Sequence, residues 1–166
     1  MTAWWPDDLK LASFNPLARF GASDMRSHAA QKRDEELRTR FDQGVMMLHM
    51  RQYEHALTSF HRVLELSPNM PEAHVNMGFA LLGLKRWAAA RDFFESATAL
   101  RREQANAYYG LAIALEESGD KAGAMGAMKT FLHRAPADDP FRRKAESALW
   151  EWQSAATAPT APAKDK

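Results

Sequence analysis

Three histidines at a regular spacing are the first side chains in this sequence that could hold a metal ion. His49, His55 and His61 follow one another at intervals of six residues. Six residues turn an α-helix by about 600°, so each imidazole would point about 120° away from the one before it. Metal ligands must converge on one point, and a turn is also expected within this stretch. The spacing therefore predicts no metal site, and we interpret His61 and Glu65, one helical turn apart, as a surface pair.

An acidic group is the second candidate for chemistry. Glu116, Glu117 and Asp120 lie close together, and neighbouring carboxylates can act as general acid and base. The sequence has no glycine-rich phosphate loop and no nucleophile elbow to accompany them. It also has no cysteine, which excludes thiolate ligands, disulfides and a cysteine nucleophile. We therefore expect no catalytic residue and no cofactor, and interpret the carboxylates as surface charge or as a contact for a basic residue of a ligand.

Composition and charge are those of a soluble globular protein. The chain has 166 residues, of which 46% are hydrophobic and 26% charged, and its formal net charge is +1. Such a balanced chain has no overall field that would attract nucleic acid, so we expect no nucleic-acid partner. No apolar run approaches the roughly 20 residues that cross a bilayer, and Pro6 with two aspartates after it does not fit a signal peptide. We expect a cytoplasmic protein whose N-terminal segment alone offers peripheral membrane contact.

The main feature of the sequence is a repeat of 34 residues. Three blocks align without a gap, over residues 37–70, 71–104 and 105–138. Small residues at positions 8 and 20 would let two antiparallel helices approach. Large apolar residues at position 24 would fill the space between the helices. Proline at position 32 would end the second helix. The residues at these positions are Gly44, Gly78 and Ala112, then Ala56, Ala90 and Ala124, then Phe60, Phe94 and Met128, and finally Pro68 and Pro136.

This pattern resembles the tetratricopeptide repeat. The resemblance covers residues 37–138 and implies an all-α fold, a right-handed superhelix of three tetratricopeptide helix pairs. The first block departs from the family pattern, because Arg40 and Gln43 replace a large aromatic residue and a leucine, and Arg102 replaces the proline of the second block. We expect polar groups or the preceding segment to cover the first helix.

Segments on both sides of the repeats complete the expected organisation. Residues 1–36 are interpreted as an N-terminal arm and a lead-in helix. Residues 139–153 are predicted to form a capping helix that closes the apolar end of the solenoid. Residues 154–166, rich in alanine, threonine and proline, are predicted to be a disordered tail.

The N-terminal arm is dense in apolar residues and is interrupted by Pro6 and Pro16. Apolar side chains in this number need a cover. One interpretation is that the arm packs back on this domain or on a second copy, which makes a homodimer an open alternative. The other is a docking arm for a partner protein or a membrane surface, with Trp4, Trp5, Phe14 and Phe20 as its docking residues.

The family resemblance also implies a binding groove. In this family the first helices line the concave face, and Asn76 stands where members often use asparagine to hydrogen-bond the backbone of a ligand. A groove of apolar residues suits an extended or helical peptide of another protein, and the protein's own arm or a dimer mate is the alternative occupant. The predicted groove residues are Phe41, Val45, Leu48, Val75, Asn76, Phe79, Tyr109 and Ile113.

The sequence does not match the family members that grip the C-terminal carboxylate of a chaperone. Those members carry lysine, asparagine and arginine at groove positions that hold Phe41, Val45, Asn106 and Gly110 here, so Asn76 alone remains. We expect a non-catalytic interaction scaffold or assembly chaperone. The alternatives are a structural subunit anchored in a larger complex by the arm, an assembly factor for pili or cytochromes, and a secretion chaperone. In size, repeat number and apolar groove the chain resembles the class II chaperones of type III secretion translocators.

Overall fold

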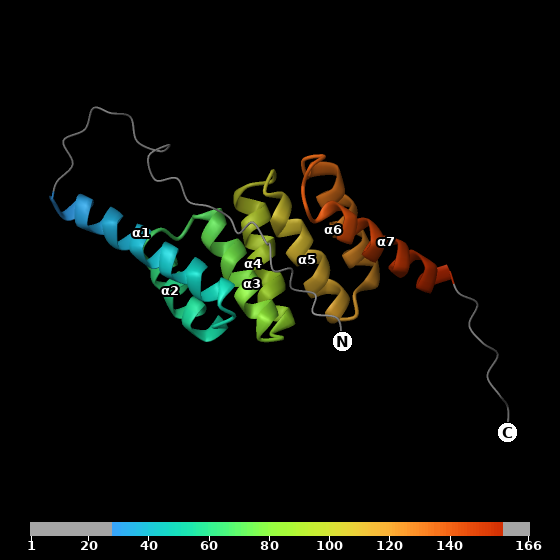
Figure 1. The fold of residues 1–166 in the computed structure, drawn as a ribbon, viewed down its shortest axis with the longest axis horizontal. Coiled ribbons are helices and arrows are strands. Elements are labelled where there is room, and N and C mark those ends of the chain that lie inside the picture. The colour runs from blue at the N-terminus through green and yellow to red at the C-terminus, as the bar shows by residue number, and fades with distance from the viewer. Residues whose placement is uncertain (1–27, 158–166) are drawn as a thin grey trace, which may run out of the picture.

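The computed structural model describes residues 28–157, and within these residues the chain forms α-helices and no strand. Figure 1 shows the helices stacked one after another along a single axis. No helix in this part of the chain is both long and apolar enough to span a membrane. The helices are α1 (His28–His49), α2 (Tyr53–Leu66), α3 (Pro71–Gly83), α4 (Trp87–Leu100), α5 (Ala105–Glu117), α6 (Lys121–Arg134) and α7 (Arg142–Thr157).

Three helix pairs follow the 34-residue repeat. α1 packs on α2, α3 on α4 and α5 on α6, and α3 and α5 begin at Pro71 and Ala105, the first residues of the second and third blocks. The pairs also contact one another through α2 with α3 and α4 with α5. One hydrophobic core therefore runs through the pairs, and the predicted all-α solenoid is confirmed.

Small residues in the first helices make room for rings from the second. A Cβ added to Gly44 would lie 2.7 Å from the ring of Phe60, and one added to Gly78 would lie 2.6 Å from the ring of Phe94. Either clash would force the helices apart, which explains the small residue at position 8. The alanines at position 20, which are Ala56, Ala90 and Ala124, are all 0% exposed.

Each first helix ends in the same left-handed turn. The residue at position 15 has a positive φ in all three repeats: 58° at Arg51, 60° at Lys85 and 89° at Gly119. The next residue then donates its N–H back across the helix end, as Arg86 does to the carbonyl of Leu81 at 2.9 Å. This is the hydrogen bond of a Schellman motif. It satisfies a carbonyl at the helix end and turns the chain into the second helix.

The lead-in helix expected at the end of residues 1–36 and the first helix of the repeats are one continuous helix, α1. Its N-terminal half is held on α2 by side chains. The guanidinium of Arg62 donates to the Glu36 carboxylate at 2.7 and 3.1 Å, and Arg33 donates to the carbonyl of Leu66. The hydrogen bond from Arg62 holds the pKa of Glu36 below its usual range. Polar groups thus fasten the start of the solenoid.

The last helix, α7, closes the other end. Its joint with α6 depends on Arg142, which donates to the carbonyls of Leu132 at 2.7 Å and Ala135 at 3.0 Å, and so satisfies the C-terminal end of α6. Phe141 packs its ring 5.4 Å from that of Tyr109. α7 continues to Thr157, into the stretch that was expected to be a disordered tail, and the rest of that stretch lies outside the described residues.

Candidate binding groove

The predicted groove residues lie on the first helices of the three pairs, α1, α3 and α5. The structure divides them into two sets by exposure. Val45 and Ile113 are partly buried and pack against the core. The other set is almost completely buried, with exposed fractions of 2% for Phe41, 0% for Leu48, Val75 and Asn76, 1% for Phe79 and 5% for Tyr109.

The three aromatic residues of the buried set pack edge-on against the second helix of their own pair. Such edge-to-face pairs stabilise a core beyond simple burial. These rings therefore hold the helix pairs together and set the shape of the surface above them. The ring centroids lie 5.8 Å apart for Phe41 and Phe60, 5.1 Å for Phe79 and Phe94, and 5.3 Å for Tyr109 and Phe131.

Tyr109 is the residue of this set whose pKa is shifted by its surroundings. Its ring lies between those of Phe131 and Phe141. Burial raises the pKa of Tyr109 to about 12, because the phenolate would lose its hydration in this apolar setting. The phenol is therefore neutral at physiological pH, and Tyr109 acts as an apolar residue with one polar atom.

Asn76 is a fully buried amide at the centre of α3. Buried polar groups are costly unless they are hydrogen-bonded, so an asparagine here restricts what can pack against it. Its predicted role in fixing the register of a ligand backbone stays a prediction.

Polar side chains around the predicted groove are engaged in local contacts. Glu72 forms an ion pair with Arg101 at the end of α4, and Gln104 donates to the amide oxygen of Asn106 at 3.0 Å. In the acidic group, the Asp120 carboxylate accepts the Gly123 N–H at 2.9 Å and so caps α6. An aspartate just before a helix is a capping signal, so this structural role could have been inferred from the sequence.

The histidine candidates stay apart on the surface. His61 lies 3.5 Å from Glu65, and both side chains are substantially exposed, as the surface interpretation predicted. His49 and His55 are exposed as well. Across residues 28–157, no group of three or more histidine, aspartate or glutamate side chains is placed to hold a metal ion.

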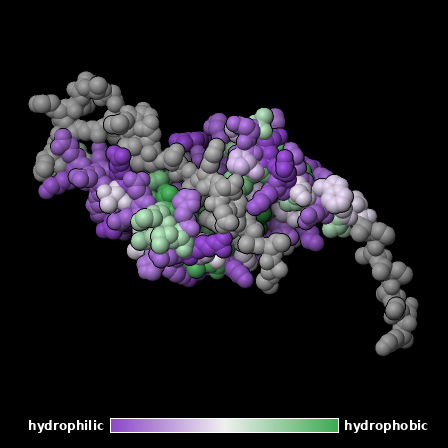
Figure 2. All heavy atoms as spheres, viewed as in Figure 1, coloured by the Kyte–Doolittle hydropathy of each residue, from purple (hydrophilic) through white to green (hydrophobic). Residues whose placement is uncertain are grey.

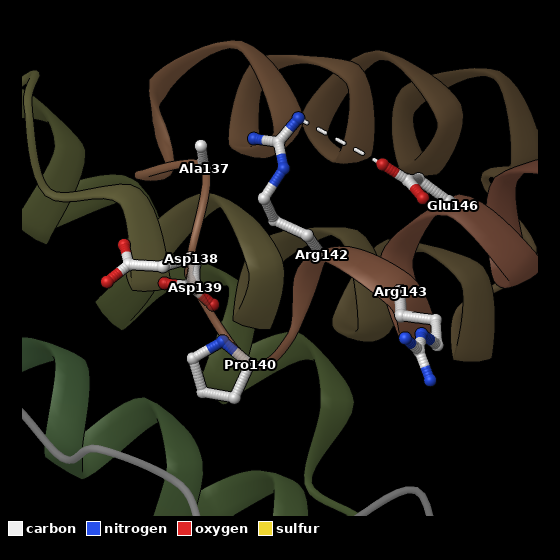
Figure 3. Close-up of a pocket in the computed structure, with 7 residues that line it drawn as sticks. All are labelled: Ala137, Asp138, Asp139, Pro140, Arg142, Arg143 and Glu146. Carbon is white, nitrogen blue, oxygen red and sulfur yellow. Dashed lines mark ion pairs between the residues drawn. The ribbon is translucent and has the colours of Figure 1, made fainter.

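A hollow at the joint of α6 and α7 is lined by polar side chains (Figure 3). Arg142 extends along this hollow to Glu146, with 4.0 Å between the two charged groups, while its guanidinium also donates to the carbonyls at the end of α6. Because this charge already stabilises the joint, we interpret the hollow as part of the capping structure. Its lining residues are Ala137, Asp138, Asp139, Pro140, Arg142, Arg143 and Glu146.

Exposed apolar side chains at the two ends of the solenoid were missed by the sequence analysis. Met46 on α1 and Met50, the residue just after α1, are 55% and 59% exposed, and Trp150 on α7 is 69% exposed. Figure 2 shows the apolar patch over the C-terminal half of α1. The helical phase of Met46 and Met50, opposite the buried residues of α1, was a signal that could have located them. The predicted docking residues Trp4, Trp5, Phe14 and Phe20 lie outside the described residues.

Solved structures with the same helix arrangement include secretion and chaperone-binding proteins. A type III secretion complex from Aeromonas hydrophila matches with a TM-score of 0.71 at 14% identity, covering 81% of this chain and 93% of that one. The translocator chaperone SycD of Yersinia enterocolitica gives 0.69 at 13% identity, with coverage of 75% and 96%. The first tetratricopeptide domain of Spaghetti (RPAP3), bound to an HSP90 peptide, gives 0.68 at 19% identity, with coverage of 75% and 95%. At these identities the likeness concerns the fold alone.

Sequence comparison gives a relative and a family. The cytochrome c-type biogenesis protein CycH of Bradyrhizobium diazoefficiens is 30% identical over 100 residues, which are 58% of this chain and 27% of that protein. The chain thus spans about a quarter of that relative's length. Models of the tetratricopeptide repeat match residues 47–103 and 106–138, together more than half of the chain. With three helix pairs at the repeat period, the chain belongs to the tetratricopeptide repeat family.

Proposed function

We propose that this protein is a non-catalytic interaction scaffold or assembly chaperone that binds an apolar peptide or helix of another protein along the first helices. The observation that carries the proposal is the arrangement of α1, α3 and α5. Position 9 of the repeat is apolar in all three blocks, with Val45 on α1, Phe79 on α3 and Ile113 on α5. Repeat solenoids use the concave surface lined by such helices for binding. The apolar character favours a partner that buries aliphatic or aromatic side chains.

The structural relatives support this proposal through what they bind. One was solved with an HSP90 peptide, another with an HSP70 peptide, and a third is a translocator chaperone. Here Phe41 and Gly110 stand where carboxylate-gripping members carry charged or amide side chains, and a Cβ on Gly110 would collide with the Phe94 ring. We therefore propose an internal apolar segment of the partner as the ligand, rather than a C-terminal carboxylate.

The test is a comparison of captured proteins between the wild type and a groove variant. Phe79 and Tyr109 are unsuitable for substitution by glutamate, because a carboxylate at 1% or 5% exposure would unfold the core. The variant Val45→Glu, Ile113→Glu instead changes the partly buried positions. We expect one protein to be lost from its captures in quantitative mass spectrometry, and peptides of that protein to bind the wild type in solution at least about tenfold more tightly than the variant.

A matched control separates the groove from the rest of the surface. Ala88→Glu, Ala99→Glu adds the same charge at two exposed positions of α4. Circular dichroism of both variants checks that they keep the helicity of the wild type. If the control and the groove variant capture the same proteins, the first helices are not the working surface.

A second candidate function is favoured by the sequence relative. The 30% identity to a cytochrome c-type biogenesis protein supports a role as an assembly factor that holds a cytochrome precursor. In a deletion strain of the source organism, this role predicts a loss of c-type cytochromes on a haem-stained gel, restored by the wild-type gene but not by the groove variant. Normal cytochrome levels in the deletion strain would reject this role and would favour a structural subunit or a secretion chaperone instead.

A further inference from the structure

The first helix of each inner pair has one face that packs on the pair before it. A Cβ added to Gly110 on α5 would collide with the ring of Phe94 on α4. In the same way, a Cβ added to Gly83 on α3 would collide with the ring of Tyr53 on α2. Gly110 stands at position 6 of its repeat and Gly83 at position 13, and positions 3 and 10 share this face of the helix. The alanines at positions 3 and 10 of the second and third repeats, Ala73, Ala80, Ala107 and Ala114, are all 0% exposed.

On α1 the same face is exposed. Its positions 3, 6, 10 and 13 are Thr39, Asp42, Met46 and His49, and each of these side chains is exposed. Met46 is 55% exposed, although the alanines at its position in the other repeats are fully buried. Met50 extends the apolar surface by one turn, and its N–H still donates to the carbonyl of Met46 at 3.0 Å, as in the helix. Within residues 28–157, this face lacks the helix that covers its counterparts on α3 and α5 (Figure 2).

The inner pairs also show what kind of element covers this face. α2 covers it on α3, and α4 covers it on α5. In both cases two consecutive helices are joined by a link of four residues, 67–70 or 101–104, and helices joined by so short a link run antiparallel. The face on α1 therefore fits an antiparallel helix, which would continue the packing of the solenoid.

A second copy of α1 supplies such a helix. A two-fold axis perpendicular to α1 makes the two copies antiparallel and brings the same face together from both. With the axis beside Met46, the two Met46 side chains meet. Asp42 of one chain then lies opposite Met50 of the other chain and beside its His49, so no carboxylate faces a second carboxylate. Arg38 pairs with Asp42 at 4.0 Å within one helix, so the face carries both signs of charge and no net repulsion opposes the contact.

We propose that residues 39–50 form a homodimer interface in which the α1 helices of two copies pack antiparallel about Met46. The interface is separate from the groove, because consecutive residues such as Val45 and Met46 point about 100° apart on a helix. The proposal therefore does not rest on the proposed function. The face is about 18 Å long. Two helix faces of this length bury less than the roughly 1,200 Å² of a stable interface, so the dimer dissociates on dilution.

The first test is the oligomeric state of the full chain, measured by sedimentation over a wide range of micromolar concentrations. The wild type is expected to pass from monomer to dimer in this range. Met46→Glu, Met50→Glu brings like charges together at the two-fold axis and is expected to raise the dissociation constant at least about tenfold. Trp150→Glu, which changes an exposed side chain on α7, is the matched control and is expected to leave the dissociation constant unchanged. Circular dichroism checks that both variants keep the helicity of the wild type.

The second test is cross-linking, which the lack of cysteine in the chain makes specific. Met46→Cys is expected to form an intermolecular disulfide on mild oxidation. Asp42→Cys is not expected to do so by itself, because the axis places the two copies of this residue about 12 Å apart along the helices, beyond the roughly 7 Å that a disulfide allows between Cα atoms. An equimolar mixture of Asp42→Cys and Met50→Cys is expected to give the disulfide between the two variants.

The opposite results would overturn the proposal. A wild type that stays monomeric at every concentration would show that the face binds no second copy. Equal weakening of the dimer by Trp150→Glu would assign the contact to the other end of the solenoid. Disulfide formation by Asp42→Cys alone, as efficient as in its mixture with Met50→Cys, would contradict the antiparallel arrangement.

Discussion

At the scale of single residues, the solenoid depends on side chains that are small enough for two helices to touch. Ala90 is 0% exposed and lies between α3 and α4. Ala90→Leu adds three carbon atoms where no space exists, and overpacking of this kind costs about 1–3 kcal/mol. We expect urea unfolding to show that loss. Ala88→Leu, exposed on the same helix, is the control and is expected to change stability by less than about 0.5 kcal/mol. If the two variants have the same free energy of unfolding, the assignment of Ala90 to the contact between α3 and α4 is wrong.

A second residue-scale prediction concerns alkaline pH. Burial raises the pKa of Tyr109 from 10.0 to about 12, so between these values the unfolded chain releases a proton that the folded chain keeps. Stability contributed by the neutral phenol is complete below pH 10 and is lost as the pH rises toward 12, by about 2–3 kcal/mol in all. Tyr109→Phe removes this group. The stability difference between wild type and Tyr109→Phe, measured by urea unfolding at pH 9 and pH 11, is expected to shift in favour of the variant. A constant difference would contradict the raised pKa.

At the scale of the helices, the turn inside each pair sets the angle between its members. Lys85 adopts the left-handed conformation with φ of 60°, which costs a residue with a Cβ about 1–2 kcal/mol. Glycine adopts this conformation without strain. Its greater conformational freedom in the unfolded chain offsets part of the stability that is gained. Lys85→Gly is therefore expected to raise the free energy of unfolding by about 0.5–1 kcal/mol in thermal or urea unfolding.

Two glycines of the third repeat are expected to respond to alanine substitution in opposite ways, because one needs a positive φ and the other does not. Gly119 has a φ of 89°, so Gly119→Ala is expected to lower stability by about 1 kcal/mol. Gly126 lies exposed on α6, and an added Cβ there meets no atom within 4 Å, so Gly126→Ala is expected to raise stability by up to about 1 kcal/mol. If both substitutions act in the same direction, the turn conformation is not the cause.

The helices were predictable because the same small and large residues recur at the same positions in all three blocks. Gly44 and Gly78 each face a phenylalanine of the second helix, Ala112 holds the same position in the third block, and no single block would have made that pattern distinct. Lys85 and Arg51 show where prediction from one residue fails, since only comparison with Gly119 reveals that their position needs a positive φ. The exposure of Phe79 was not predictable, because helical phase places a residue on a face but says nothing about what covers that face.

The groove helices also show that the position of a residue on a helix does not determine what its side chain packs against. Sequence position assigned Phe41, Phe79 and Tyr109 to the concave surface, yet their rings pack against Phe60, Phe94 and Phe131 in the core. An aromatic side chain is long enough to reach sideways from a groove position into the space between two helices. For this reason the partly buried Val45 and Ile113, which cannot reach that far, are better sites for testing partner binding than the larger rings.

At the scale of the whole molecule, stability is shared between neighbouring repeats. Each helix pair contacts the next pair in the chain, so the middle pair has partners on both sides, whereas α7 contacts the solenoid chiefly through α6. In such quasi-one-dimensional folds the ends open more easily than the centre. Native-state hydrogen exchange is expected to show the strongest protection in α3 and α4 and the weakest in α7.

Removing one contact of the cap tests how far this coupling extends. Phe141 is 6% exposed and packs against Tyr109, and Phe141→Ala is expected to cost about 3 kcal/mol, typical of a buried phenylalanine. If the repeats behave as neighbours in a row, α6 and α7 lose most protection, α5 loses less, and α1 and α2 keep the exchange rates of the wild type. If the solenoid instead unfolds as a single unit, the slowest amides of all helices will exchange faster by the same factor, and a partner bound over α3 would then stabilise the cap as strongly as it stabilises the groove.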